Sequence, residues 1–422
     1  MRIACSASLL LLAGCGEEDF GRGPASDGGP DSGAGGDAGT DAGGPDCEGR
    51  YAGAPTSRGD HVSVWSDAPG ELVVFGGDDG VPEACAPAPS YVDELWVFET
   101  DCGTWRQIEG ASGPGPLARA SAVLDSARNR MVLFGGRSQA GGGAYDQHDD
   151  VWALDLDALS WTEVATSGTG PSGRSNAVAV VDEPGDRMIV FGGNTSASGA
   201  SFAPTADAFA LDLETHEWSQ VGPGDGPPAR LFHAAAATPD AMIVHAGGDE
   251  NAFFGPFLSD LWRLDLATDT WEEISATGGP PDARISGALV SHAGTDSIAL
   301  FGGHDDGVLG NRNDLWRLDV TDATWSAVGS GDVLDNTDVG FCDFPADFTT
   351  QDLAFPERRS ASTLAADGAG SAWLFGGKTD CGLANDVWRL DLATGAWTEV
   401  RVANQGLSCE RQGRIGCTSY CL

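Results

Sequence analysis

The sequence predicts an all-β fold, a β-propeller of six blades with four antiparallel strands in each. This fold is predicted by three motifs that occur six times each in a fixed order, because a repeat of roughly 55 residues is typical of an array of supersecondary units. The first motif is Pro-x-x-Arg, at Pro55/Arg58, Pro116/Arg119, Pro171/Arg174, Pro227/Arg230, Pro281/Arg284 and Pro356/Arg359. The second is a glycine pair, at Gly76-Gly77, Gly135-Gly136, Gly192-Gly193, Gly247-Gly248, Gly302-Gly303 and Gly376-Gly377. The third is an aromatic pair nine residues apart, at Trp96/Trp105, Trp152/Trp161, Phe209/Trp218, Trp262/Trp271, Trp316/Trp325 and Trp388/Trp397.

Each repeat divides into four expected strands, taken in chain order. The first follows the arginine, as in residues 119–124, and the second is the apolar run before the glycines, as in residues 298–301. The third alternates apolar and polar residues around the first aromatic. The fourth starts at the second aromatic, after a turn rich in Asp, Thr and Gly that is typical of a hairpin. No stretch has the pattern of an amphipathic helix, and six such sheets in tandem can close into a ring.

An apolar run, two glycines and two spaced aromatic residues form a signature that resembles kelch repeats over roughly 350 of the 422 residues. The resemblance implies that the first strands line a central channel and the fourth strands are outermost. The family's first aromatic is commonly Tyr, whereas this chain has Trp in five repeats and Phe209 in one. The fourth repeat has His245-Ala246 before its glycines. We expect the Trp rings to fill the wedges between blades, where each contributes roughly 3 kcal/mol; a sugar-stacking platform is the alternative.

The N-terminal residues predict export. Residues 1–14 have an early arginine and a short apolar core, as a signal peptide does, and they lead into Leu-Ala-Gly-Cys at 12–15, which resembles a bacterial lipobox. The resemblance implies lipidation of Cys15 and sorting to the outer membrane; an ordinary secretory signal is the alternative. Residues 15–46 are expected to be a lipidated tether too poor in apolar residues to fold. The propeller is expected over residues 47–402, and a Cys-containing tail over 403–422.

Eight cysteines remain after the predicted signal and lipidation site. Their even number in an exported chain favours disulfides, with the connectivity open. They are Cys47, Cys85, Cys102, Cys342, Cys381, Cys409, Cys417 and Cys421. We expect Cys47 and the tail cysteines to fasten the ring, because the repeats share no strand between the first blade and the last. Cys342 and Cys381 could pair, whereas a Cys85–Cys102 pair requires the loop 78–92 to fold across its blade.

The chain is strongly acidic, with 63 Asp and Glu against 23 Lys and Arg and a net charge of −40. Such a surface repels phosphate, so no nucleic-acid partner is expected. It favours basic partners and cations, although a solvated surface without specific meaning is the alternative. Membrane contact is expected through the lipid anchor only, and the sequence does not predict an oligomeric state.

The arginines of the Pro-x-x-Arg motifs are expected to ring the channel mouth. Guanidinium groups suit carboxylates and phosphates, so this ring is a candidate site for an anionic or acidic-peptide ligand. Its members are Arg58, Arg119, Arg174, Arg230, Arg284 and Arg359. Internal pairing with acidic loop residues is the alternative, and these are Asp78, Asp79, Asp249, Glu250, Asp305 and Asp306. Ca²⁺ binding by these loops has less support, because none has EF-hand spacing.

No catalytic residue, metal or cofactor is expected. The seven histidines are scattered, no Cys-x-x-Cys or P-loop occurs, and no tyrosine lies in a repeat strand to form the copper site of kelch oxidases. The sequence therefore favours a non-catalytic scaffold that binds a protein or a surface glycan. The alternative is a kelch enzyme acting on a sugar or acidic small molecule at the channel mouth, since acid–base chemistry needs only a few residues there.

Overall fold

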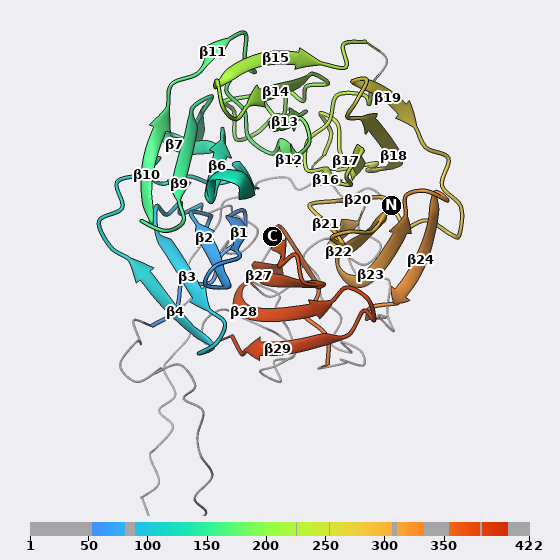
Figure 1. The fold of residues 1–422 in the computed structure, drawn as a ribbon. Helices are drawn as coiled ribbons and strands as arrows, with labels where there is room; N and C mark the ends of the chain where they lie inside the picture. The colour runs from blue at the N-terminus through green and yellow to red at the C-terminus, as the bar shows by residue number, and fades with distance from the viewer. Residues whose placement is uncertain are drawn as a thin grey trace, which may run out of the picture. The chain divides into compact units, whose positions relative to one another are not determined.

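The computed structural model describes residues 53–80, 89–224, 226–252, 254–305, 310–332, 354–379 and 382–403. These residues form six blades around a central axis, which confirms the predicted all-β, six-bladed propeller (Figure 1). Their one helical element is a 3₁₀ turn, Ser126–Arg128. None of them forms a helix long and apolar enough to cross a membrane.

The first three blades follow one plan in chain order. Blade one contains β1 (Val62–Ser66), β2 (Glu71–Phe75), β3 (Leu95–Glu99) and β4 (Thr104–Ile108). Blade two contains β5 (Ser121–Asp125), β6 (Arg130–Phe134), β9 (Val151–Asp155) and β10 (Ser160–Val164), with an added hairpin of β7 (Arg137–Gly141) and β8 (Ala144–Gln147). Blade three contains β12 (Val178–Asp182), β13 (Arg187–Phe191), β14 (Ala208–Asp212) and β15 (Glu217–Val221). A short strand from the preceding linker, β11 (Ser167–Gly168), pairs in parallel with β15.

The last three blades have longer central strands. Blade four contains β16 (Ala234–Ala237), β17 (Ala241–Gly247), β18 (Leu258–Asp265) and β19 (Thr270–Glu273). Blade five contains β20 (Arg284–Ile285), β21 (Ala288–Ser291), β22 (Ser297–Asp305), β23 (Asn311–Asp319) and β24 (Thr324–Gly329). Blade six contains β25 (Arg359–Ser360), β26 (Thr363–Ala366), β27 (Ser371–Thr379), β28 (Gly382–Asp391) and β29 (Trp397–Arg401).

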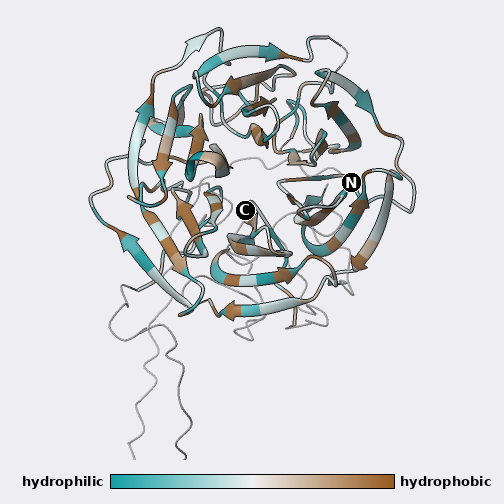
Figure 2. Ribbon diagram, in the orientation of Figure 1, coloured by the Kyte–Doolittle hydropathy of each residue, from teal (hydrophilic) through white to brown (hydrophobic). Residues whose placement is uncertain are grey.

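The four main strands of each blade pair in sequence order, and the short strands β20 and β25 pair with β22 and β27 of their own blades. The described part of blade one therefore takes no strand from the end of the chain. The innermost strands β1, β5, β12, β16, β21 and β26 are neighbours around the axis. In Figure 2, β2 and β3 are largely hydrophobic whereas the outermost strand β4 is largely hydrophilic. The apolar core therefore lies inside and between the blades.

The second Trp of every blade fills a seam, as predicted. Each packs its ring on the aromatic residue that stands just before the glycine-pair position of the preceding blade, with centroids 4.8–5.4 Å apart. The pairs are Phe75–Trp161, Phe134–Trp218, Phe191–Trp271, His245–Trp325, Phe301–Trp397 and Phe375–Trp105. The last of these closes blade six onto blade one.

The fourth glycine pair was assigned one residue too late. Arg230 Nη1 donates to the carbonyl of Ala246, as Arg284 Nη1 does to that of Gly302. Ala246 has the same left-handed conformation, with φ of 62°. The pair equivalent to Gly302-Gly303 is therefore Ala246-Gly247, and His245 takes the place of the phenylalanine that stands before the glycine pair in the other five blades.

Several predictions concern residues outside those described. They are the signal peptide 1–14, the tether 15–46, the lipidation site Cys15, and seven cysteines: Cys47, Cys85, Cys342, Cys381, Cys409, Cys417 and Cys421. Cys102, between β3 and β4, is disulfide-bonded, and the cysteine bonded to it lies outside the described residues. The domain boundaries and the disulfide pairing therefore stay predictions.

Candidate functional site

Five of the six predicted ring arginines are buried in internal ion pairs. Their exposed fractions are 0–1%. Each pairs with the carboxylate two residues before the first aromatic of its own blade; the pairs are Arg58–Glu94, Arg174–Asp207, Arg230–Asp260, Arg284–Asp314 and Arg359–Asp386. The structure thus does not place these five on the surface of the channel mouth. Their partners also differ from the loop carboxylates considered from the sequence.

The Arg284–Asp314 pair shows how such a cluster is satisfied. Arg284 Nη1 and Nη2 donate to the two carboxylate oxygens at 2.7 and 2.8 Å, and Nη1 also donates to the Gly302 carbonyl at 2.9 Å. Trp316 Nε1 donates to Asp314 Oδ2 at 2.8 Å. Burial alone would raise the pKa of Asp314, but the hydrogen bonds and charge of Arg284 reverse this and lower it. The carboxylate therefore stays ionised and joins the first and third strands.

Arg119, the sixth predicted member, occupies a different position. The backbone carbonyl of Leu117 accepts from Gly77 N as that of Arg174 accepts from Gly136 N, so Leu117 is the residue equivalent to the buried arginines. Arg119 lies two residues later, at the position of Asn176 in blade three. The equivalent residues are Asp60, Arg119, Asn176, Phe232, Ser286 and Ala361, and all have φ between 52° and 60°.

These six left-handed residues surround the axis where the first strands begin. Five hydrogen bonds of 2.7–3.1 Å join them, each from the backbone N–H of one residue to the carbonyl of its equivalent in the preceding blade. One of the five, from Asp60 N to the Ala361 carbonyl, crosses from blade one to blade six. Each non-glycine residue in this conformation costs roughly 1 kcal/mol or more, and such strain is concentrated at functional sites.

A pocket of about 130 Å³ opens at this end of the axis. Its charged wall consists of Asp60, Arg119 and Lys378, and its apolar wall includes Phe232, Phe257 and Ile285. His304 and Ser286 add polar groups. Below it, a second cavity of about 130 Å³ and one of about 480 Å³ follow the first strands along the axis. An apolar pocket with a few convergent polar groups is a typical ligand site.

Asp60 is the anion at the centre of the charged wall. Its Oδ2 lies 3.1 Å from Arg119 Nε and 2.8 Å from Lys378 Nζ. Burial alone would raise the pKa of Asp60, but the charges of Arg119 and Lys378 hold it well below its ordinary value. Arg119 also lies over the Phe232 ring, 5.2 Å from its centroid.

A third cation, Arg137, lies on the β7–β8 hairpin beside this group. Its guanidinium stacks 3.8 Å from the Tyr145 ring centroid, and its Nε donates to the Tyr91 hydroxyl at 2.7 Å. Burial, together with the charge of Arg119, lowers the pKa of Arg137. Three cations, Arg119, Arg137 and Lys378, therefore face two carboxylates, those of Asp60 and Asp78, in an otherwise acidic protein.

Comparison with known proteins identifies the family. A family model described as the KLHDC2/KLHL20/DRC7 kelch-repeats domain matches residues 45–183 and 140–334, which together make up more than half of the chain. The chain belongs to the kelch-repeat family. Its resemblance to kelch repeats in the sequence is thereby confirmed.

Several eukaryotic proteins resemble this kelch chain. It is 30% identical to acyl-CoA-binding domain-containing protein 4 of Arabidopsis thaliana, over 51% of the chain and 31% of that protein. It is 32% identical to Adagio protein 3 of the same plant, over 50% of the chain and 32% of that protein. It is 27% identical to human kelch domain-containing protein 10, over 55% of the chain and 51% of that protein. The chain therefore spans between about a third and about half of these relatives.

The loop carboxylates of this kelch propeller have several local roles. Asp78 lies 3.9 Å from Lys378, and Asp305 pairs with Arg312 at 2.9 Å. Asp79 accepts from Thr56, and Asp249 from the backbone of Asn251. Asp306 lies outside the described residues, and within those described no three His, Cys, Asp or Glu side chains are arranged to hold a metal ion.

Lys378 and Arg137 were missed by sequence reasoning. Each follows its glycine pair directly, Gly376-Gly377 and Gly135-Gly136. A search for basic residues directly after the glycine pair would have found both.

Proposed function

We propose that this kelch propeller is a non-catalytic binding module that takes an anionic segment of a partner protein at the channel mouth. Its family supports a role in protein interaction. The observation that carries the proposal is the pocket around Arg119, whose charged wall faces Phe232 and Phe257. A carboxylate of the partner would meet Arg119 and Lys378, and an apolar side chain would cover the aromatic wall.

Charge supports an anionic ligand. Each of the five buried arginines has a carboxylate of its own, whereas Arg119, at a different position, shares Asp60 with Lys378. The group of Arg119, Arg137 and Lys378 against Asp60 and Asp78 has an excess of one positive charge. In a protein with a net charge of −40, this makes the mouth a local attractor for anions.

We further propose that the module is carried on a lipoprotein of the cell envelope, anchored through Cys15. The support is the Leu-Ala-Gly-Cys sequence at 12–15 and the polar tether that follows it. The full chain should sediment with membranes, and Cys15→Ala should move it to the soluble fraction. Retention of the variant on membranes would contradict the anchor.

The binding proposal is tested with the full chain against fractionated envelope proteins and acidic polysaccharides. We expect a protein ligand whose affinity falls at least roughly tenfold in Arg119→Ala, because a charge-assisted hydrogen bond contributes about 1.5–3 kcal/mol. Arg263→Ala is the matched control, since Arg263 pairs with Asp240 and Asp265, away from the pocket. Equal binding by the two variants would refute the site, and turnover of an acidic sugar lost in Arg119→Ala would instead favour a kelch enzyme.

A further inference from the structure

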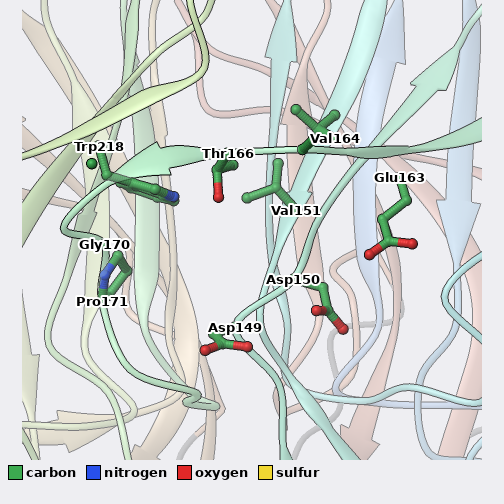
Figure 3. A pocket seen from close by; sticks show the side chains of 11 residues that line it. Asp149, Asp150, Val151, Glu163, Val164, Thr166, Gly170, Pro171 and Trp218 are labelled. Carbon is green, nitrogen blue, oxygen red and sulfur yellow. The ribbon is translucent and has the colours of Figure 1, made fainter.

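A further cavity, of about 340 Å³, lies between blades two and three (Figure 3) and shares no lining residue with the pocket at the channel mouth. Asp149 and Asp150 lie on one side of it, Glu163 comes from the outermost strand β10, and Trp218 comes from β15 of the next blade. Thr166, in the linker between the blades, also lines it. Three carboxylates thus face a space that an indole ring closes on the other side.

Asp150 is the residue equivalent to the carboxylates that bind buried arginines in the other blades. Its backbone carbonyl accepts from Gly135 N as that of Asp207 accepts from Gly192 N. In blade two, however, Leu117 replaces the arginine, so Asp150 has lost its guanidinium. Its side chain is 49% exposed, against 3–33% for the five paired carboxylates.

No cation within the described residues replaces that guanidinium. The nearest group, His148 Nδ1, lies 3.7 Å from Asp150 Oδ2, and His148 Nε2 is 2.8 Å from the Ser138 hydroxyl. Asp149 and Glu163 form no ion pair with any described residue. A cation in the cavity would therefore meet carboxylates that no guanidinium or ammonium group of the described residues neutralises.

Trp218 supplies a hydrogen-bond donor on the opposite side of the cavity. The residue is only 5% exposed, yet its indole nitrogen faces the cavity and donates to no acceptor of the described residues. This N–H is open to the cavity, so a ligand oxygen that enters there would accept a hydrogen bond from it. Figure 3 shows the Thr166 hydroxyl turned into the same space.

We propose that this cavity binds an arginine side chain of a partner protein, with its guanidinium on Asp150 and a neighbouring carbonyl on Trp218 Nε1. The protein itself shows the chemistry: five equivalent carboxylates each bind a guanidinium, in four cases together with a Trp indole N–H. Asp149 and Glu163 favour the same positive charge. This site does not depend on the channel mouth.

The test uses the full chain with ¹⁵N-labelled tryptophan and the probe N-acetyl-argininamide. The indole N–H signal of Trp218, assigned with Trp218→Phe, should shift on titration. The neutral isostere N-acetyl-citrullinamide should leave it in place. Asp150→Asn should weaken binding at least tenfold, and Leu117→Arg should abolish it by supplying the internal guanidinium that other blades have. Asp322→Asn, an exposed carboxylate on blade five, is the control and should bind as the unmodified protein does.

Three results would overturn the inference: no shift with the arginine probe, an equal shift with the citrulline probe, or unchanged affinity in Asp150→Asn. If Leu117→Arg does not fold, the titration of Asp150→Asn still tests whether Asp150 binds the arginine probe. Because Arg119→Ala leaves this cavity intact, loss of the mouth ligand and loss of the arginine probe are separate results.

Discussion

Each buried arginine at the start of a blade satisfies a carboxylate and a backbone carbonyl with one guanidinium. Removing two charges from water costs several kcal/mol per ion, and the paired geometry only compensates for that cost. The arrangement is therefore better evidence for a defined register between the first and third strands than for net stability. Breaking it from one side leaves an uncompensated buried charge.

Replacing Asp314 by Ala should lower the free energy of unfolding by roughly 3–5 kcal/mol, since Arg284 stays buried without its carboxylate. Urea unfolding followed by tryptophan fluorescence measures this loss. Asp322→Ala, on the surface of the same blade, should change it by less than about 0.5 kcal/mol. A loss below about 1 kcal/mol for Asp314→Ala would mean that water reaches the guanidinium.

Three buried histidines make the propeller sensitive to acid. Burial, and after it the charge of a nearby arginine, lowers the pKa of His61 and His233 to about 3 and that of His245 to about 4. His61 and His233 pack on Phe375 and Phe191, and His245 Nε2 is buried without a hydrogen-bond partner among the described residues. In the unfolded chain each titrates near 6.5.

Stability should therefore fall as the pH drops below 6.5, because the unfolded chain binds protons at these histidines and the folded state does not. Each histidine contributes a slope of at most about 1.4 kcal/mol per pH unit, and this slope ends near its folded pKa. His245→Phe, which restores the residue of the other five blades, should flatten the curve between pH 6.5 and 4.5. Urea midpoints across that range measure it, and His216→Gln, on a partly exposed histidine, is the control. Parallel curves for His245→Phe and the unmodified protein would contradict the buried neutral imidazole.

At the scale of elements, the strands were predictable because their periodicity recurs six times. The exact alignment of equivalent residues between blades was not predictable. Arg119 stands three residues after Pro116, so spacing alone could not separate it from the buried arginines. What separates them is the backbone: Arg119 has φ of 60°, whereas Leu117 accepts the inter-blade hydrogen bond. Likewise, the fourth glycine-pair position was misassigned, because the left-handed conformation of Ala246 cannot be recognised from the sequence. The pocket lies at the end of the channel where the arginine ring was predicted, but of the six predicted arginines it contains Arg119 alone.

The β7–β8 hairpin was not foreseen, because its Gly-rich stretch reads as a loop. On this hairpin Arg137 stacks on Tyr145, and we expect the two side chains to be energetically coupled. In a double-mutant cycle with Arg137→Met and Tyr145→Ala, we expect a coupling energy of roughly 0.5–2 kcal/mol in unfolding experiments. Additive effects of the two substitutions would show that the contact contributes nothing.

At the scale of the whole molecule, the ring is closed by the same contacts that join its other blades. Phe375 packs on Trp105, Asn385 Nδ2 donates to the Pro55 carbonyl, and Trp65 stacks on Trp373. The hydrogen bond from Asp60 N to the Ala361 carbonyl continues the inner ring across this seam. The described strands of blades one and six are not interleaved. The closure is therefore held by these side-chain contacts and backbone hydrogen bonds, and by any disulfide that joins the two blades.

The closing seam should consequently be as costly to disrupt as an internal one. Trp105→Ala and Trp161→Ala each remove a ring packed at 4.8 Å on a phenylalanine, and each should lower the free energy of unfolding by roughly 3–5 kcal/mol. Unfolding in guanidinium chloride should show a single transition for both variants, since opening one seam exposes two blades to solvent. If the predicted disulfides also fasten blade one to blade six, reduction should enlarge the loss in Trp105→Ala and leave that in Trp161→Ala unchanged. A much smaller loss in Trp105→Ala, under reducing conditions as well, would show that the ring does not depend on its last seam.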